Sequence, residues 1–212
     1  LNARDTYEEM YWKYGYDRYF DSFEHYYSLY QRRNLDLWAE YADGKVTKEE
    51  LNRQRYLYPL EAVGAGDSTL AKAYERDALT MIPTKSKLMP HAREVLEYLS
   101  GKYNLYILSN GFKELQSHKM RSSGIDEYFK KVVLSDDIGI LKPWPEIFHF
   151  ALSTTQSELN NSLMIGDSWE NDIVGAAGVG MHQVFYNLSG RTDLPFAPTY
   201  QITDLKDLFN FL

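Results

Sequence analysis

The stretch Ser162-Leu-Met-Ile-Gly-Asp-Ser-Trp-Glu-Asn-Asp172 decides the fold of this chain. Its apolar run, residues 163–165, is broken by Gly166 and followed at once by acidic and hydroxyl side chains. A buried parallel strand presents polar groups in this way at its carboxyl end, where α/β proteins bind ligands. The pattern then becomes helical, so we expect Asp167 just after the strand and Asp172 in the first helical turn.

Asp167 and Asp172 therefore form a candidate metal site. Two carboxylates that point into one crevice suit a hard cation such as Mg²⁺, which binds few carboxylates and completes its shell with water and substrate phosphate. A structural role is about equally common for such residues, because aspartate often caps a helix beside a glycine turn. The rest of the chain has to separate these two interpretations.

On both sides of this stretch, from residue 83 to the end, short apolar runs alternate with helical patterns. This alternation predicts a parallel sheet with helices on both faces, a Rossmann-like α/β domain. The expected strands are residues 103–108, 132–134, 163–165, 183–186 and 199–202. Helices are expected from Pro90 to Gly101, up to Gly124, from Pro143 and Pro145 onward, after Trp169, and after a cap at Asp204.

Residues 1–82 carry helical periodicity only, so we expect a separate all-helical domain before the α/β domain of residues 83–212. Aromatic side chains recur there at positions i, i+3, i+4 and i+7, as expected for one apolar helix face. Four helices are predicted, ending near Gly15, near Gly44, at Tyr58 before Pro59, and at Leu79. The aromatic stripe is either the core of an antiparallel bundle or a face that lines a substrate site.

Composition excludes several classes of protein. The chain has 212 residues, 44% of them hydrophobic and 25% charged, and a net charge of −7 without a basic run. Nucleic acid is therefore not expected as a main partner. No apolar stretch approaches the ~20 residues that span a bilayer, and no signal-peptide pattern opens the chain. Cysteine is absent, which rules out disulfides, and we expect a cytoplasmic protein as the default.

Two further motifs are weak when taken alone. Ser109-Asn110-Gly111 follows a predicted strand, where a hydroxyl and backbone N–H groups can hold a phosphate, although these residues also form ordinary polar turns. Lys142 precedes Pro143 in a loop, where it is either a solvated surface charge or a point charge that neutralises phosphate.

Other catalytic chemistries find no support in the sequence. The five histidines show no ligand-like spacing, so a zinc site is not expected. Ser109 lacks the Gly-x-Ser-x-Gly turn of a serine hydrolase. Gly175, Gly178 and Gly180 follow a helix instead of a strand, which indicates helix packing instead of dinucleotide binding.

Together, the motifs resemble a known family. A strand followed by Ser-Asn-Gly, then Lys-Pro, then a strand followed by Gly-Asp-Ser-x-x-x-Asp resembles the second, third and fourth motifs of the haloacid dehalogenase-like hydrolases. The resemblance covers residues 83–212, and residues 1–82 are similar to the α-helical cap that this family places after its first motif. Leu108-Ser-Asn-Gly-Phe112 is especially similar to its small-metabolite and nucleotide monophosphatases.

The resemblance implies a role for each candidate residue. Ser109-Asn110-Gly111 would line the phosphate pocket, with the Ser109 hydroxyl holding the phosphoryl group. Lys142 would balance charge beside the nucleophile. Asp167 would bind Mg²⁺ directly, and Asp172 would act as a second-shell or water-mediated ligand.

The implied reaction is Mg²⁺-dependent hydrolysis of a small phosphate ester, with nucleoside monophosphates among the candidates, through an aspartyl-phosphate. The cap would select the leaving group, and the protein would be a monomer or homodimer. The alternatives on the same fold are a 2-haloacid dehalogenase, a sugar-phosphate mutase and a non-catalytic binding protein. Dehalogenases need no metal and resemble Ser-Ser-Asn at the fourth motif, so Asp167 favours the phosphatase.

One departure from the family matters most. Its first motif, a strand ending in Asp-x-Asp, supplies the nucleophile and the general acid, and this sequence begins in the cap. Asp5, Asp17 and Asp21 lie on helical patterns and are not assigned as nucleophile. Loss of a central strand leaves several buried groups unpaired at ~1–3 kcal/mol each, against a total stability of ~5–15 kcal/mol. We therefore expect that strand to precede Leu1, and a chain truly lacking it to be inactive.

Overall fold

A computed structural model describes residues 2–212 and divides the chain into two compact units, Leu1–Lys87 and Leu88–Leu212. The sequence places the change of pattern near residue 82. The following segment stays with the helical unit because the Asn2 side-chain amide donates to the carbonyl of Lys87 at 2.9 Å. Within the described residues, no helix is long and apolar enough to cross a membrane.

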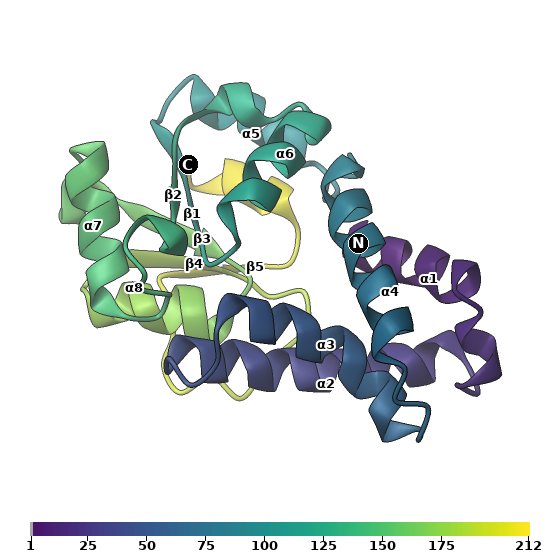
Figure 1. The fold of residues 1–212 in the computed structure, drawn as a ribbon. Helices are drawn as coiled ribbons and strands as arrows, with labels where there is room; N and C mark the ends of the chain where they lie inside the picture. Colours follow the sequence, from purple (N-terminus) through teal and green to yellow (C-terminus); the bar gives the residue numbers. More distant parts are fainter. Residues whose placement is uncertain (1) are drawn as a thin grey trace. The chain divides into compact units, whose positions relative to one another are not determined.

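The first unit is entirely helical, as the periodicity predicts (Figure 1). Ser22, Thr47 and Asp67 cap the second, third and fourth helices, each accepting a hydrogen bond from a backbone N–H of the first turn. The elements are α1 (Asn2–Lys13), α2 (Phe23–Ala42), α3 (Lys48–Ala62), α4 (Ser68–Met81) and the short 3₁₀ turns η1 (Tyr16–Arg18) and η2 (Ile82–Thr84).

Helix α3 is longer than the sequence predicts. Proline lacks an N–H and usually ends a helix, so we expected a stop at Pro59, and this was wrong. The helix continues to Ala62 because Leu57 and Leu60, on either side of the proline, are buried in the core of the unit. Packing of these side chains outweighs the local cost of the proline.

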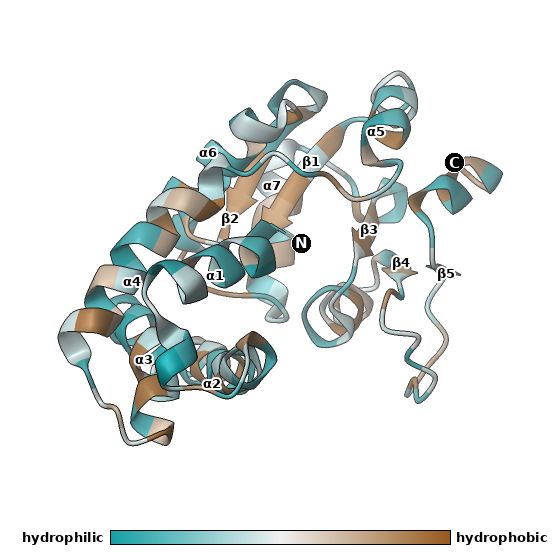
Figure 2. Cartoon of the chain, turned by 90° about the vertical axis from the view of Figure 1, so that its right-hand side faces the viewer, coloured by the Kyte–Doolittle hydropathy of each residue, from teal (hydrophilic) through white to brown (hydrophobic). Residues whose placement is uncertain are grey.

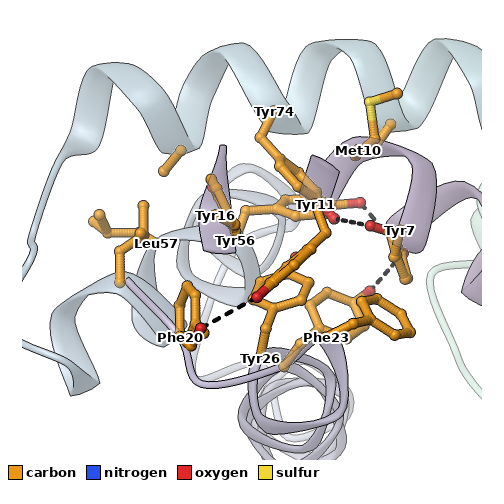
Figure 3. Close-up of a cluster of buried hydrophobic side chains, with 14 of the residues drawn as sticks. Tyr7, Met10, Tyr11, Tyr16, Phe20, Phe23, Tyr26, Tyr56, Leu57 and Tyr74 are labelled. Atoms are coloured by element: carbon orange, nitrogen blue, oxygen red, sulfur yellow. Dashed lines mark hydrogen bonds between the residues drawn. The ribbon is translucent and has the colours of Figure 1, made fainter. Parts of the chain in front are cut away.

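The core of the helical unit is built mainly from tyrosine. Figure 3 shows the rings of Tyr7, Tyr11, Tyr26 and Tyr74 gathered between the helices, together with Phe20 and other apolar side chains. Several hydroxyls bond inside the cluster, whereas those of Tyr16 and Tyr26 are buried without a hydrogen-bond partner. Tyr11 donates to the Phe20 carbonyl at 3.2 Å, and Tyr74 donates to the Tyr7 carbonyl at 3.0 Å. The aromatic stripe is therefore the core of the bundle.

The second unit alternates strands with helices, which confirms the predicted α/β fold. Its strands are β1 (Leu105–Ser109), β2 (Phe129–Leu134), β3 (Leu163–Gly166), β4 (His182–Tyr186) and β5 (Tyr200–Ile202). Its α-helices are α5 (Ala92–Ser100), α6 (Lys113–Ser123), α7 (Pro145–Thr155) and α8 (Gly175–Gly178). Shorter helical turns are η3 (Asp126–Tyr128), η4 (Ser135–Asp137), η5 (Leu159–Asn161), η6 (Trp169–Val174) and η7 (Leu205–Asn210).

The strands form two separate parallel sheets in the described part of the chain. One sheet pairs β1 with β2, and the other has the order β3-β4-β5. In the first, Ser109 lies opposite Leu134, and in the second, Gly166 lies opposite Phe185. Figure 2 shows β1 and β2 apart from the other three strands, and the brown colour marks β1 and β2 as largely hydrophobic.

The two sheets nevertheless share both of their hydrophobic layers. Leu105 of β1 and Leu163 of β3 pack in one cluster with α5 and η7. Leu108 and Met164, the residues that point to the opposite faces, pack in another cluster with α7 and α8. Because β1 and β3 are both edge strands, Ile165 remains 37% exposed in the middle of the unit. These two edges are where the sequence analysis expects a further strand.

Candidate functional site

The Ser109 hydroxyl lies at the carboxyl end of β1. Its oxygen accepts two hydrogen bonds, one from the Gly111 N–H at 3.0 Å and one from the Gln116 amide at 2.6 Å. Both bonds use the oxygen as acceptor, so the hydroxyl proton can be donated to another group. Gly111 makes the second bond possible, because a Cβ at that position would lie 2.8 Å from the Gln116 Nε2.

Asn110 fixes the main chain of Lys142. Its Oδ1 accepts from the Lys142 N–H at 2.7 Å, and its Nδ2 donates to the Lys142 carbonyl at 3.0 Å. The amide is the planar partner that can satisfy one donor and one acceptor of the same residue at once. The loop that carries Lys142 is thus tied to the end of β1, although 32 residues separate the two positions.

The Lys142 ammonium is buried between the two sheets, with only 8% of the residue exposed. It donates to the Leu108 carbonyl at 2.8 Å and to Asp172 Oδ1 at 2.6 Å. An ammonium carries a further N–H beyond these two, which can reach an additional anionic group. Lys142 is therefore a positive charge held in place by both sheets.

Asp172 is the partner of this lysine and is 5% exposed. It lies in η6, a π-helical turn that begins after Ser168, and its Oδ2 accepts from the Ser168 N–H at 3.0 Å. π-helical turns occur frequently at functional sites. Gly166 leaves room for this carboxylate, because a Cβ there would lie 2.3 Å from Asp172 Oδ2. Both carboxylate oxygens of Asp172 are thus engaged by the protein.

Asp167, at the end of β3, is exposed and differs from Asp172 in both burial and partners. It makes no hydrogen bond or ion pair with any of residues 2–212. Burial, together with the charges of Asp204 and then Asp167, raises the pKa of Tyr186 at the neighbouring end of β4. An open carboxylate oxygen fits a hard cation that takes its other ligands from water and phosphate. No group of three metal-ligating side chains occurs within residues 2–212.

The loop between β4 and β5 supports the π-helical turn. Arg191 pairs with Glu170 at 2.6 Å, and this hydrogen bond lowers the pKa of the Glu170 carboxyl. Trp169 packs edge-on against Phe185 and lies 4.9 Å from the ring centre of Phe196. These contacts stabilise η6, so the position of Asp172 depends on β4 and on the loop between β4 and β5.

The structure brings most of the predicted residues together. Ser109, Asn110, Lys142 and Asp172 form one connected arrangement, and Asp167 follows the same strand that leads to Asp172. Sequence reasoning missed Gln116 as the partner of Ser109. Its only signal was a place in the first turns of the helix that follows the motif, from which a side chain can reach back to the strand end.

Comparison with known proteins identifies the family of the chain. A family model described as haloacid dehalogenase-like hydrolase matches residues 3–180. Pyrimidine 5'-nucleotidase YjjG of Escherichia coli is 30% identical over 185 residues, covering 86% of this chain and 80% of that protein. Phosphoserine phosphatase of Thermus thermophilus is 29% identical over 180 residues, covering 82% and 67%. The crystal structure of YfnB from Bacillus subtilis bound to magnesium superposes with a TM-score of 0.86 at 25% identity, covering 100% of this chain and 93% of that one.

Proposed function

The chain belongs to the haloacid dehalogenase-like hydrolases, and from this premise we propose that it hydrolyses a small phosphate monoester with the help of Mg²⁺. The observation that carries the proposal is the contrast between two aspartates of one strand-to-helix turn. Asp172 is buried and paired with Lys142, whereas Asp167 presents an unpartnered carboxylate. A metal-assisted phosphatase needs both a fixed positive charge and an open oxygen ligand.

Each side chain of the site then has a defined task. The Ser109 hydroxyl donates its proton to a phosphoryl oxygen, since its own oxygen is occupied by Gly111 and Gln116. The remaining N–H of Lys142 neutralises charge on the phosphoryl group during transfer. Asn110 acts as a positioning residue, because its amide is used by the Lys142 main chain and not by substrate.

Asp167 would hold the metal, with Asp172 behind it. When bound, Mg²⁺ supplies Lewis-acid stabilisation of the negative charge on the phosphoryl oxygens. The fit rests on the exposure of Asp167 and on the commitment of both Asp172 oxygens to Lys142 and Ser168. Asp172 therefore keeps Lys142 in place and would act on the metal only indirectly, as a second-shell or water-mediated ligand.

We further propose that the nucleophilic carboxylate comes from a strand that pairs with β1 and β3. The support is structural. Both are edge strands of separate parallel sheets, they share two hydrophobic layers, and Ile165 is left exposed between them. A parallel strand in this position would deliver its C-terminal residues beside Ser109 and Asp167, because carboxyl ends of parallel strands meet at one edge.

We propose the substrate class from the activities that the names of the relatives describe. Their names describe a pyrimidine nucleotidase and a phosphoserine phosphatase, so their leaving groups differ while the phosphate ester is common to both. We propose a small phosphorylated metabolite, with nucleoside monophosphates as the first candidates.

The test is a phosphate-release assay on the full-length protein with nucleoside monophosphates, sugar phosphates and phosphoserine, with Mg²⁺ and with chelator. Chelator should abolish hydrolysis. Asp167→Asn should lower kcat/KM at least about 100-fold, because a metal ligand contributes several kcal/mol to transition-state stabilisation. Asp126→Asn, which removes an exposed carboxylate elsewhere in the unit, serves as the matched control and should leave the rate unchanged.

Three outcomes would contradict the proposal. Unchanged Mg²⁺-dependent hydrolysis by Asp167→Asn would reject the metal assignment. Chelator-insensitive release of halide from a 2-haloacid would identify a dehalogenase. Full activity of residues 1–212 alone would remove the need for a nucleophile from another strand.

A further inference from the structure

The helical unit contains a buried cation without a counter-ion. Arg55 of α3 is only 7% exposed, and its guanidinium carbon lies 5.0 Å from the ring centre of Tyr56. The phenol groups of Tyr7 and Tyr30 are also close enough to act on its charge. Figure 3 shows the neighbouring Tyr7 and Tyr56 rings pointing toward each other in the core. Arginine is almost never buried to this degree unless it is paired.

The guanidinium of Arg55 has a hydrogen-bond partner at one nitrogen and lacks one at another. Its Nη2 donates to Asn52 Oδ1 at 2.5 Å, and its Nε is buried without any partner. No Asp or Glu oxygen in residues 2–212 forms an ion pair with it. By contrast, Arg53 on the same helix is exposed and pairs with Glu50 at 2.7 Å. Burying a guanidinium without an ion-pair partner is costly, so an acceptor for the Nε–H would stabilise the folded unit.

The surrounding side chains cannot neutralise this charge. Burial raises the pKa of both Tyr7 and Tyr30, so these phenols stay protonated at neutral pH. Burial also raises the pKa of Glu75, whose charge acts on Arg55 from beyond ion-pair distance. The permanent positive charge of Arg55 is therefore surrounded by neutral phenols, with the Glu75 carboxylate acting on it only from a greater distance.

The same groups are suited to binding an anion. Tyr7 is hydrogen-bonded to Tyr30 at 2.7 Å between the hydroxyls and lies 3.4 Å from the Tyr56 hydroxyl, so the three phenols form a short chain. A phenol can donate a hydrogen bond as readily as it accepts one. The planar guanidinium matches the geometry of carboxylate and phosphate oxygens.

We infer that Arg55, with the hydroxyls of Tyr7, Tyr30 and Tyr56, forms an oxyanion-binding site inside the helical unit, for a carboxylate or phosphate group. An oxyanion satisfies the unpartnered Nε–H and neutralises the charge in one step, which a neutral acceptor does not. The anion has two sources, a free ion such as inorganic phosphate or an anionic group on the leaving part of a substrate. The site itself does not depend on the proposed function.

The first experiment measures thermal unfolding of the full-length protein during titration with inorganic phosphate, at ionic strength held constant with sodium chloride. We expect the midpoint to rise by about 3 °C or more at saturation, as for any ligand that binds only the folded state. Arg55→Met should lose this shift and should unfold at the same or a higher temperature without phosphate. Removing an unpaired buried charge in favour of an apolar side chain is neutral or stabilising.

Arg53→Met is the matched control on the same helix and should keep the phosphate shift. A midpoint that falls by several degrees in Arg55→Met while the shift persists would identify a purely structural arginine and overturn the inference. Failure of Arg55→Met to fold has the same meaning, because the site predicts no loss of stability. A native protein whose midpoint does not respond to phosphate or acetate would also overturn it.

A kinetic arm, which does rest on the proposed phosphatase, separates the two sources of the anion. Phosphoserine and phosphoethanolamine differ only by a carboxylate on the leaving group. If the substrate supplies the anion, Arg55→Met should lower kcat/KM at least about 10-fold for phosphoserine alone, equal to about 1.4 kcal/mol. If a free anion occupies the site, neither kcat/KM changes while the thermal shift is lost. Absence of all hydrolysis contradicts the proposed function but leaves the thermal result intact.

Discussion

The two units of this protein bury polar groups in different ways. The helical unit buries neutral tyrosine hydroxyls, several of which bond to each other or to nearby backbone, as Tyr11 does with Phe20. The α/β unit buries full charges, Lys142 and Asp172, which meet across the two sheets. A bonded hydroxyl costs little to bury, whereas a buried ion pair is often no better for stability than a well-packed apolar pair.

The two kinds of buried polar group have different explanations. Several tyrosine hydroxyls of the helical unit find partners inside the core, so their burial needs no ligand. For the ion pair of the α/β unit we propose a task, because it fixes a positive charge at the carboxyl end of β1. Arg55 differs from these tyrosines because it buries a full charge whose Nε has no partner, and the inferred oxyanion would supply one.

The largest expected effect comes from breaking the ion pair. Lys142→Met leaves the Asp172 carboxylate buried and uncompensated, so we expect a loss of about 3–5 kcal/mol in the free energy of unfolding. Phosphatase activity should be lost as well. The double variant Lys142→Met/Asp172→Leu should recover most of the stability and none of the activity. Denaturant unfolding and a phosphate-release assay measure the two quantities separately.

Lys130→Met, an exposed change on β2, is the control and should stay within about 0.5 kcal/mol of the native protein. If the double variant were as unstable as the single one, the charges would be structural, and the contrast between the units would disappear.

A smaller effect is expected at Gly166. Gly166→Ala places a methyl group 2.3 Å from Asp172 Oδ2, so the carboxylate has to move away from Lys142. We expect destabilisation by about 1–3 kcal/mol, the usual range for overpacking, and a fall in kcat. Gly178→Ala, where a methyl group meets nothing within 4 Å, should be neutral or stabilise by up to ~1 kcal/mol. Equal behaviour of the two alanines in denaturant titration and assay would show that the site tolerates displacement of Asp172.

The smallest effect is expected in the tyrosine core. Tyr11→Phe removes the hydrogen bond to the Phe20 carbonyl and should cost about 0.5–1.5 kcal/mol, with kcat and the Mg²⁺ requirement unchanged. Tyr58→Phe, at a half-buried tyrosine of α3, is the control and should have no measurable effect on unfolding. A fall in kcat for Tyr11→Phe would mean that the tyrosine core takes part in catalysis.

Much of the fold follows from local pattern. The period of the aromatic residues in the first unit predicts its helices, and the apolar runs before Ser109 and Gly166 predict β1 and β3. The separation of the strands into two parallel sheets is consistent with the family resemblance, from which we expect a further strand between them. Pro59 was misjudged because buried neighbours outweigh its local preference.

The sequence by itself determined which residue types stand at the ends of the strands, because a strand, a glycine and a polar turn are local features. Only the tertiary structure decided which of them meet. Asn110 reaches the main chain of Lys142, and Lys142 reaches Asp172, across 32 and 30 residues. The burial of Arg55 without a counter-ion is equally invisible in the sequence. Such pairings depend on the packing of whole elements, and packing is a property of the folded chain rather than of any one segment.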